Sequence, residues 1–407
     1  MRHLKYFIFG IGFAFLFSAC QPEGPSIDDH YLNYPVPEFQ TVTKNYAVGV
    51  EYLYGVSSYG SSEEVIELFS SPPVVGSYTS VFNMNADSTE IILDVHLRWI
   101  NQAKIDYLLL SCRPKYMTAT PPSVGLANDT NFVSLFTTDS TNIERVKASP
   151  EIGELKFALK YEFGTTLLGT EAPSKRDSSM IVENKMAGDI TAEEAMIKDF
   201  VECLSSFYND SRMMKVDGKP LIYIPNAYRL YSGNAIAFFA KLRKAVKDAT
   251  GHELFIVGQQ ERWSPPARFE YLLKNTVDAI YHARYVEIDV NDFNRVYAFH
   301  PLVDQNWKYS KNWFNGWGTQ YVPNISPAWN ANLGNTNAIS PYYLPYLPRT
   351  EEFFNKYCTV AKWNADVSNL VLISSWNFWH YDSQIEPSEN YGTAYLDIIK
   401  KQFKINP

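Results

Sequence analysis

Histidine and cysteine are scarce in this chain, with seven and four copies among 407 residues. No histidine pair has the H-x-x-x-H spacing and no cysteine pair has the C-x-x-C spacing, so a metal centre is not predicted. No G-x-G-x-x-G or P-loop follows the first strand-like segment, and G-x-S-x-G is absent. Nucleotide binding and an activated serine are therefore not predicted, and no cofactor is expected.

Positive charge is also in short supply. The 36 lysines and arginines are outnumbered by 44 aspartates and glutamates, which gives a net charge of −8. Nucleic-acid binding would require a basic stripe, so we expect no nucleic-acid partner. Hydrophobic residues make up 46% of the chain, enough for a large buried core.

The N-terminus has the pattern of an export signal. Basic "MRHLK" precedes the apolar run "YFIFGIGFAFLF", which is too short to span a bilayer. The following "SAC" resembles the lipobox of bacterial lipoproteins, although Phe17 is unusual there. The resemblance implies a signal peptide over 1–19, lipidation of Cys20, a Pro-rich tether over 20–45 and a cell-envelope lipoprotein, with the outer membrane expected and its face left open. An ordinary secretory signal is the alternative.

Beyond the tether, eight apolar or β-branched runs alternate with amphipathic helical patterns. This alternation predicts one parallel (β/α)₈ barrel over 46–407, with a doubly wound open sheet as the competing architecture. Capping boxes predict helix starts at Asp87/Glu90 and at Thr191/Glu194, Thr350 predicts another, and Gly251 predicts a helix end. The eight runs span 46–53, 105–112, 154–162, 219–226, 253–260, 277–285, 319–326 and 369–376.

In such a barrel the chemistry lies where the strands end. The residues at these ends are mainly aromatic, amide or acidic, a composition that suits sugar rings and their hydroxyls. We therefore expect an oligosaccharide or polysaccharide partner. The predicted binding residues are Tyr52, Tyr161, Glu162, Asn226, Trp263, Trp329, Trp376, Asn377, Trp379, His380, Tyr381, Gln384 and Glu386. Trp307, Trp313 and Trp317, in a long insertion, either build the cleft or fill a satellite core.

The most specific stretch is "LVLISSWNFWHYDSQIEPSENYGTAYLDII". Together with "HLRWINQAKIDYLLLS", "DGKPLIYI" and "YVPNISPAWN", it resembles glycoside hydrolase family 99 and the 71/99-like group. The resemblance covers about 46–403 and implies a (β/α)₈ fold and retaining cleavage inside α-mannosidic chains. The family motif reads approximately N-E-W-x-E-[GD]-[TN]-Q-[IL]-E-P. Its two catalytic glutamates fall on Phe378 and Tyr381 here, so the family's nucleophile and acid/base are both replaced.

Three accounts of function remain open at this point. The protein is a glycan-binding pseudoenzyme that recognises mannose-containing or related oligosaccharides, an endo-acting glycosidase with relocated carboxylates, or a structural lipoprotein. For the second account, the carboxylates within reach of the barrel mouth are Glu51, Glu162, Glu261 and Asp382. His96 is expected to be a packed surface residue of a helix rather than a ligand.

Overall fold

The structure is a computed structural model, and it describes residues 37–55, 72–76, 78–85, 89–116, 130–162, 191–230, 234–260, 273–283, 299–330 and 346–407. The predicted signal peptide, Cys20 and most of the tether lie outside these ranges. No helix in the described part of the chain is both long and apolar enough to cross a membrane.

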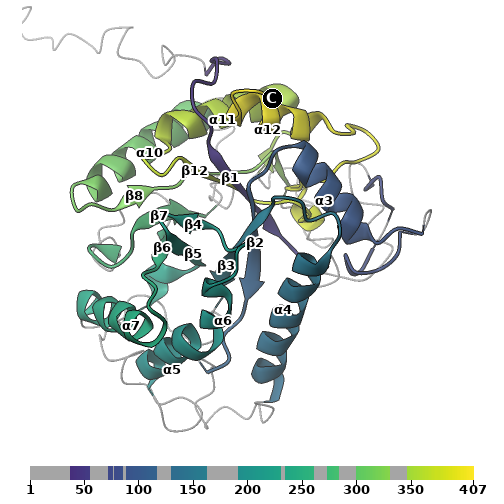
Figure 1. The fold of residues 1–407 in the computed structure, drawn as a ribbon. Coiled ribbons are helices and arrows are strands. Elements are labelled where there is room, and N and C mark those ends of the chain that lie inside the picture. Colours follow the sequence, from purple (N-terminus) through teal and green to yellow (C-terminus); the bar gives the residue numbers. More distant parts are fainter. Residues whose placement is uncertain are drawn as a thin grey trace, which may run out of the picture. The chain divides into compact units, whose positions relative to one another are not determined.

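Parallel strands occur at all eight expected places. They alternate with helices and occupy a single sheet (Figure 1). A short antiparallel strand, β4 (Lys215–Val216), pairs with β5 outside the main order. The parallel strands are β1 (Ala47–Tyr52), β2 (Tyr107–Cys112), β3 (Lys156–Tyr161), β5 (Lys219–Ile224), β6 (Phe255–Gln260), β7 (Ala279–His282), β8 (Gln320–Tyr321), β9 (Asn324–Ile325) and β12 (Leu370–Ile373).

The sheet closes on itself through its interrupted seventh strand. β8 pairs with β7, whereas β9 pairs with β12, and only Val322 and Pro323 separate β8 from β9. Backbone hydrogen bonds span the interruption, from Val322 N to Ile280 O and from Leu372 N to Pro323 O. Because β12 also pairs with β1, the strands form a ring. The predicted (β/α)₈ barrel is confirmed, and the open-sheet alternative is wrong.

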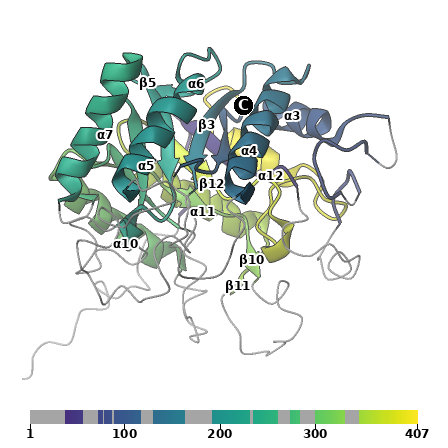
Figure 2. The ribbon, with the colours of Figure 1, turned by 90° about the horizontal axis from the view of Figure 1, so that it is seen from below.

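Helices lie outside the strands, and α5 and α7 lie side by side in both views (Figures 1 and 2). A short antiparallel ladder, β10 (Trp329–Asn330) with β11 (Tyr346–Leu347), follows the seventh strand. The helices are α3 (Ile92–Gln102), α4 (Thr130–Ala148), α5 (Ala192–Lys198) continued by the π-helical η5 (Asp199–Cys203) and α6 (Ser205–Tyr208), α7 (Ala235–Thr250), α10 (Phe299–Asn315), α11 (Glu351–Asn364) and α12 (Ala394–Phe403).

Three of the four predicted helix boundaries are confirmed. Thr191 and Glu194 form the full capping box of α5, Thr350 accepts a hydrogen bond from Phe353 N, and Gly251 ends α7 with a φ of 78°. The fourth is wrong. Ile91 is the N-cap of α3, and its apolar side chain makes no cap bond. Glu90 therefore precedes the helix, and its carboxylate pairs with Arg98 at 2.8 Å. Asp87 lies outside the described residues.

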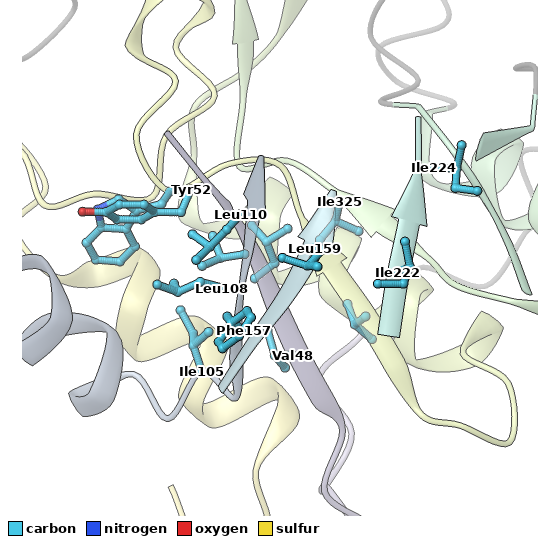
Figure 3. Packing of buried hydrophobic residues seen from close by; sticks show 14 of the residues in the cluster. Val48, Tyr52, Ile105, Leu108, Leu110, Phe157, Leu159, Ile222, Ile224 and Ile325 are labelled. Atoms are coloured by element: carbon cyan, nitrogen blue, oxygen red, sulfur yellow. The ribbon is translucent and has the colours of Figure 1, made fainter. Parts of the chain in front are cut away.

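The core has two layers. Side chains such as Val48, Leu108, Leu159 and Ile222 fill the space between the strands and the helices (Figure 3). A second cluster fills the barrel interior, where the hydroxyls of Tyr107 and Tyr223 lie 2.8 Å apart. Cys112, Cys203 and Cys358 are buried and unpaired, so they fill space in the core as small apolar residues.

Candidate functional site

The C-terminal end of the barrel interior is polar on the side of β1, β2 and β3. Side chains alternate along a strand, so Ser111 and Lys160 face the interior like Leu109 and Ala158, two residues before them. The ammonium of Lys160 lies 2.8 Å from Glu51 Oε1 and 3.0 Å from Glu162 Oε1. Ser111 donates a further hydrogen bond to Glu162, at 2.7 Å. These contacts place two carboxylates on either side of one cation at the barrel mouth.

Lys160 is the most buried member of this ionic group. Its side chain is 7% exposed, compared with 18% for Glu51 and 41% for Glu162. Burial alone would lower the pKa of Lys160, but the charges of Glu162 and Glu51 more than offset that effect and raise it. Lys160 therefore keeps its proton over the ordinary pH range and acts as a fixed cation rather than as a base.

The segment after β12 folds back onto β1. Trp376 N donates to Glu51 O at 2.8 Å, and Ile385 N donates to Trp376 O at 3.0 Å. The amide of Asn377 accepts from Leu53 N and donates to Leu53 O, both at 2.9 Å. Asn377 therefore mimics a strand partner for the end of β1, and it is fully buried.

Beneath this loop lies a buried network centred on Glu386, which has no exposed surface. Its Oε2 accepts from Tyr78 and from Trp379 Nε1, both at 2.7 Å. Its Oε1 lies 2.9 Å from His96 Nε2, and a carboxylate oxygen accepts, so Nε2 donates. Nδ1 of His96 shares a hydrogen bond with the hydroxyl of Tyr52, at 3.1 Å. Burial, aided by the charge of Glu386, raises the pKa of both Tyr52 and Tyr78, which keeps these phenols protonated.

The expectation that His96 lies on the surface is wrong, because its ring is fully buried between α3 and the loop after β12. The sequence held a signal for this position. α3 is strongly amphipathic, and His96 lies on the helical face that also carries Ile92, Leu93 and Ile100. A histidine on that face needs polar partners inside the protein, and Tyr52 and Glu386 supply them.

The two positions of the missing family glutamates are partly exposed, unlike most of the motif around them. Tyr381 stacks on Trp329, with ring centroids 4.3 Å apart and planes within 14°. Phe378 completes the cluster, at 5.3 Å from Tyr381 and 6.4 Å from Trp329. Trp329 belongs to the β10–β11 ladder, so this aromatic cluster joins the loop after β12 to the loop after the seventh strand.

Asp382 is held in a structural contact. Its carboxylate accepts from Arg349 Nε at 2.8 Å and from Gln384 Nε2 at 3.2 Å. Arg349 also donates to the backbone oxygens of Asp382 and Gln384. With a φ of 56°, Asp382 turns the chain, and the guanidinium fixes that turn beside Tyr381. Among the carboxylates proposed from the sequence, this one is best explained as a loop anchor.

The remaining predicted residues occupy different environments. Tyr161 is fully buried and donates to Asp199 at 2.9 Å, in the layer between strands and helices. Asn226 ends β5 with a φ of 55°, and its backbone N–H donates to Gln259. Trp307 is buried in α10 against Tyr357, so it belongs to the core. Glu261, Trp263 and the side chain of His380 lie outside what the structure describes.

Thus the structure brings Glu51 and Glu162 together, and it brings Trp329 together with Tyr381. It separates these from Tyr52, Trp379 and Glu386. Below the mouth, Trp379 bonds directly to Glu386, and Tyr52 is linked to Glu386 through His96. The functional sequence analysis missed Lys160, Phe378 as a packing partner, and Arg349. Lys160 could have been found, because a lysine at the end of an apolar run, two residues before Glu162 and so on the same face of the strand, implies a buried ion pair. Within the described ranges, no group of three histidine, cysteine or acidic side chains could hold a metal ion.

Comparison with known proteins agrees with this architecture. A solved glycoside hydrolase-like protein is 26% identical, with a TM-score of 0.70 over 93% of this chain and 99% of that chain. Two structures of the GH99 endo-alpha-mannosidase from Bacteroides thetaiotaomicron are 15% and 13% identical, with TM-scores of 0.51 and 0.53. Both cover 88% of this chain, and 95% and 96% of their own. The resemblance to glycoside hydrolase family 99 is confirmed at the level of the fold.

A search of curated protein sequences finds no match. The sequence model of the family described as "Glycosyltransferase WbsX" matches residues 183–399, more than half of the chain. The matched part runs from before α5 into α12 and includes the seventh strand, the aromatic cluster and the Glu386 loop. The chain is therefore a member of the WbsX family, built on a glycoside-hydrolase-like (β/α)₈ barrel.

Proposed function

We propose that this protein binds an oligosaccharide, mannose-containing or related, at the C-terminal mouth of its barrel and does not use the two-glutamate mechanism of family 99. One observation carries the proposal. The positions that would hold the two carboxylates carry Phe378 and Tyr381, and both rings pack with Trp329. A phenyl ring has no proton to transfer, and a phenol is a much weaker acid than a carboxylic acid.

The two sides of the mouth suit the two kinds of surface that a sugar presents. Partly exposed aromatic rings stack on the apolar face of a pyranose. On the β1–β3 side, Glu51 and Glu162 accept hydrogen bonds from hydroxyls, and the ammonium of Lys160 fixes both carboxylates in place. The likeness to an endo-alpha-mannosidase supports a mannose-containing ligand as the first choice.

Calorimetric titration with a panel of α-mannan oligosaccharides tests this proposal. We expect the wild type to bind at least one of them without releasing reducing ends. Tyr381→Ala should weaken binding about tenfold or more, because the ring stacked on Trp329 is lost. Tyr309→Ala is the matched control, since Tyr309 is 49% exposed on α10 and outside the aromatic cluster. Equal affinities for the two variants, or no binding by the wild type to any glycan, would contradict the proposal and favour a structural lipoprotein.

A second candidate, hydrolysis by relocated carboxylates, is favoured by the ionic group. Glu51 and Glu162 contact the same ammonium at 2.8 and 3.0 Å, so their nearest oxygens lie within about 6 Å of each other; carboxyl pairs in glycosidases are about 5–9.5 Å apart. If this pair is catalytic, the wild type releases reducing ends and Glu162→Gln abolishes that release. Glu144→Gln, which alters an exposed carboxylate on α4, should leave it unchanged.

We also propose that Cys20 carries a lipid and that the protein resides in the cell envelope. The export signal and the sequence "SAC" support this. Incorporation of a labelled fatty acid by the wild type but not by Cys20→Ser tests it. Equal labelling of the two proteins would show that Cys20 carries no lipid, and the absence of label from both would favour an ordinary secretory signal.

A further inference from the structure

The opposite end of the barrel carries a second concave site. A pocket of about 480 Å³ lies where β5, β6 and β7 begin and where α7 ends. Strands of a parallel barrel all begin at the same end, so this pocket is separated from the mouth by the packed barrel interior. Its lining carries four cationic side chains, from Lys219, Arg243, Lys244 and Lys247, in a chain whose net charge is −8.

Arg243 forms a fixed part of the pocket wall. Its guanidinium donates to Leu254 O at 2.9 Å, to Thr276 O at 3.1 Å and to Asp278 at 2.7 Å. The carboxylate of Asp278 also accepts from Ile256 N, at 2.8 Å. The Arg243–Asp278 pair therefore ties α7 to the starts of β6 and β7. Lys244 pairs with Asp248, so Lys219 and Lys247 are the cations that a ligand can recruit.

Besides Asp278, which pairs with Arg243, the pocket holds a second carboxylate. Glu253 lies between two of these lysines, 3.5 Å from Lys219 and 3.4 Å from Lys247. Hydrogen bonding and charge from Lys247, followed by Lys219, lower the pKa of this carboxyl. Both separations are longer than the 2.7–2.9 Å typical of a charge-assisted hydrogen bond. Glu253 is also 57% exposed, so the contacts are weak and a more highly charged anion can replace it.

Thr276 provides a second, independent observation. The residue is 2% exposed and lines the pocket, and its hydroxyl has no hydrogen-bond partner in the described structure. A buried hydroxyl without a partner costs free energy, which a ligand oxygen at hydrogen-bond distance recovers.

We propose that this pocket binds a phosphate group, held by Lys219 and Lys247 and by the hydroxyl of Thr276. Phosphate carries more negative charge than the carboxylate of Glu253 and has enough oxygens to meet both lysines and the hydroxyl at once. Free phosphate and the headgroup of an anionic lipid present the same chemistry.

Binding of inorganic phosphate, followed by calorimetry at constant ionic strength with chloride as the reference anion, tests the assignment. The double variant Lys219→Gln/Lys247→Gln should weaken phosphate binding at least tenfold. Thr276→Val, which keeps the shape of the side chain, should weaken it several-fold. Glu253→Gln should strengthen it about three- to tenfold, because the competing carboxylate is gone. Lys241→Gln is the matched control, since Lys241 lies on the same helix but pairs with Glu193 outside the pocket.

A second arm identifies the source of the phosphate. The full-length wild type and the same variants are each sedimented with vesicles of phosphatidylglycerol and, separately, with vesicles of phosphatidylcholine. Loss of phosphatidylglycerol binding in the double variant assigns the site to a lipid headgroup, whereas binding of inorganic phosphate alone assigns it to a soluble phosphate. Wild-type binding to neither probe, or equal losses in the double variant and Lys241→Gln, would overturn the proposal.

Discussion

Two parts of the same segment, residues 374–387, have opposite environments. Trp379 and Glu386 are 1% and 0% exposed, and each satisfies the other's polar atom. Phe378 and Tyr381, interleaved with them, are partly exposed and contact Trp329 from another loop. The retained motif residues thus hold the loop, whereas the two substituted positions face the mouth. Residues of one short motif can therefore serve packing and surface roles side by side.

The largest expected effect tests the buried part. Glu386→Ala leaves Tyr78, Trp379 and His96 without their shared acceptor, so we expect the free energy of unfolding to fall by about 3–5 kcal/mol. Urea denaturation measures this. Glu389→Ala, which removes an exposed carboxylate three residues away, should change it by less than about 0.5 kcal/mol. Similar values for the two variants would show that the Glu386 network does not hold the loop.

His300 is a buried histidine whose hydrogen-bond partner is a backbone carbonyl, whereas His96 bonds to the carboxylate of Glu386. Nε2 of His300 bonds only to Phe353 O, at 3.0 Å, among the described contacts, and burial lowers the pKa of this ring to about 4. Between pH 6.5 and 4 the unfolded chain takes up a proton that the folded chain does not. The free energy of unfolding should therefore decrease as the pH is lowered from 6.5 to 4, by up to about 1.4 kcal/mol per pH unit.

Urea denaturation across this pH range should give a shallower slope for His300→Gln than for the wild type. His252→Gln is the control, because that ring is only partly buried and bonds to Asn209 at the surface. If His300→Gln leaves the slope unchanged, the buried ring does not contribute to it.

The smallest effect on stability is expected at the exposed positions. Phe378→Leu keeps an apolar side chain but loses ring contacts worth about 0.5–1.5 kcal/mol. The free energy of unfolding should therefore decrease by no more than that amount. Glycan affinity should nevertheless fall several-fold, because a stacking face is lost. Phe378→Tyr keeps the ring and should keep the affinity. A stability loss as large as that of Glu386→Ala would show that Phe378 is part of the scaffold too.

Most of the fold follows from local patterns. The eight strands and the caps at Thr191, Gly251 and Thr350 depend on residues close together in the chain. The helix start predicted from Asp87 and Glu90 is wrong for a reason that lies outside the four-residue capping pattern. Arg98, two turns further on, offers Glu90 a bidentate partner with both distances at 2.8 Å.

The candidate site was less predictable. The sequence identified Glu51, Glu162 and Trp329 as lying near strand ends. It did not separate these mouth residues from Tyr52 and Tyr161, whose side chains point outward from the barrel to His96 and Asp199. A one-residue step along a strand reverses the side-chain direction, and the last residues of a strand are where a boundary error of that size occurs. Partners such as Arg349 for Asp382 come from another loop and have no local signal.

The sequence by itself determined the barrel, because the periodicity of its strands and helices is a property of the chain alone. It also predicts an export signal and places Phe378 and Tyr381 where the resemblance to family 99 implies two glutamates, and both of these stay predictions. Only the tertiary structure decided that Lys160 lies between Glu51 and Glu162, that Glu386 is buried on His96, and that Trp329 stacks on Tyr381. Apart from Lys160 and Glu162, which lie two residues apart, these contacts join strands and loops about 50 to 290 residues apart in the chain. Such pairs form only when barrel closure brings the strand ends together, and that closure depends on long-range pairing rather than on local sequence.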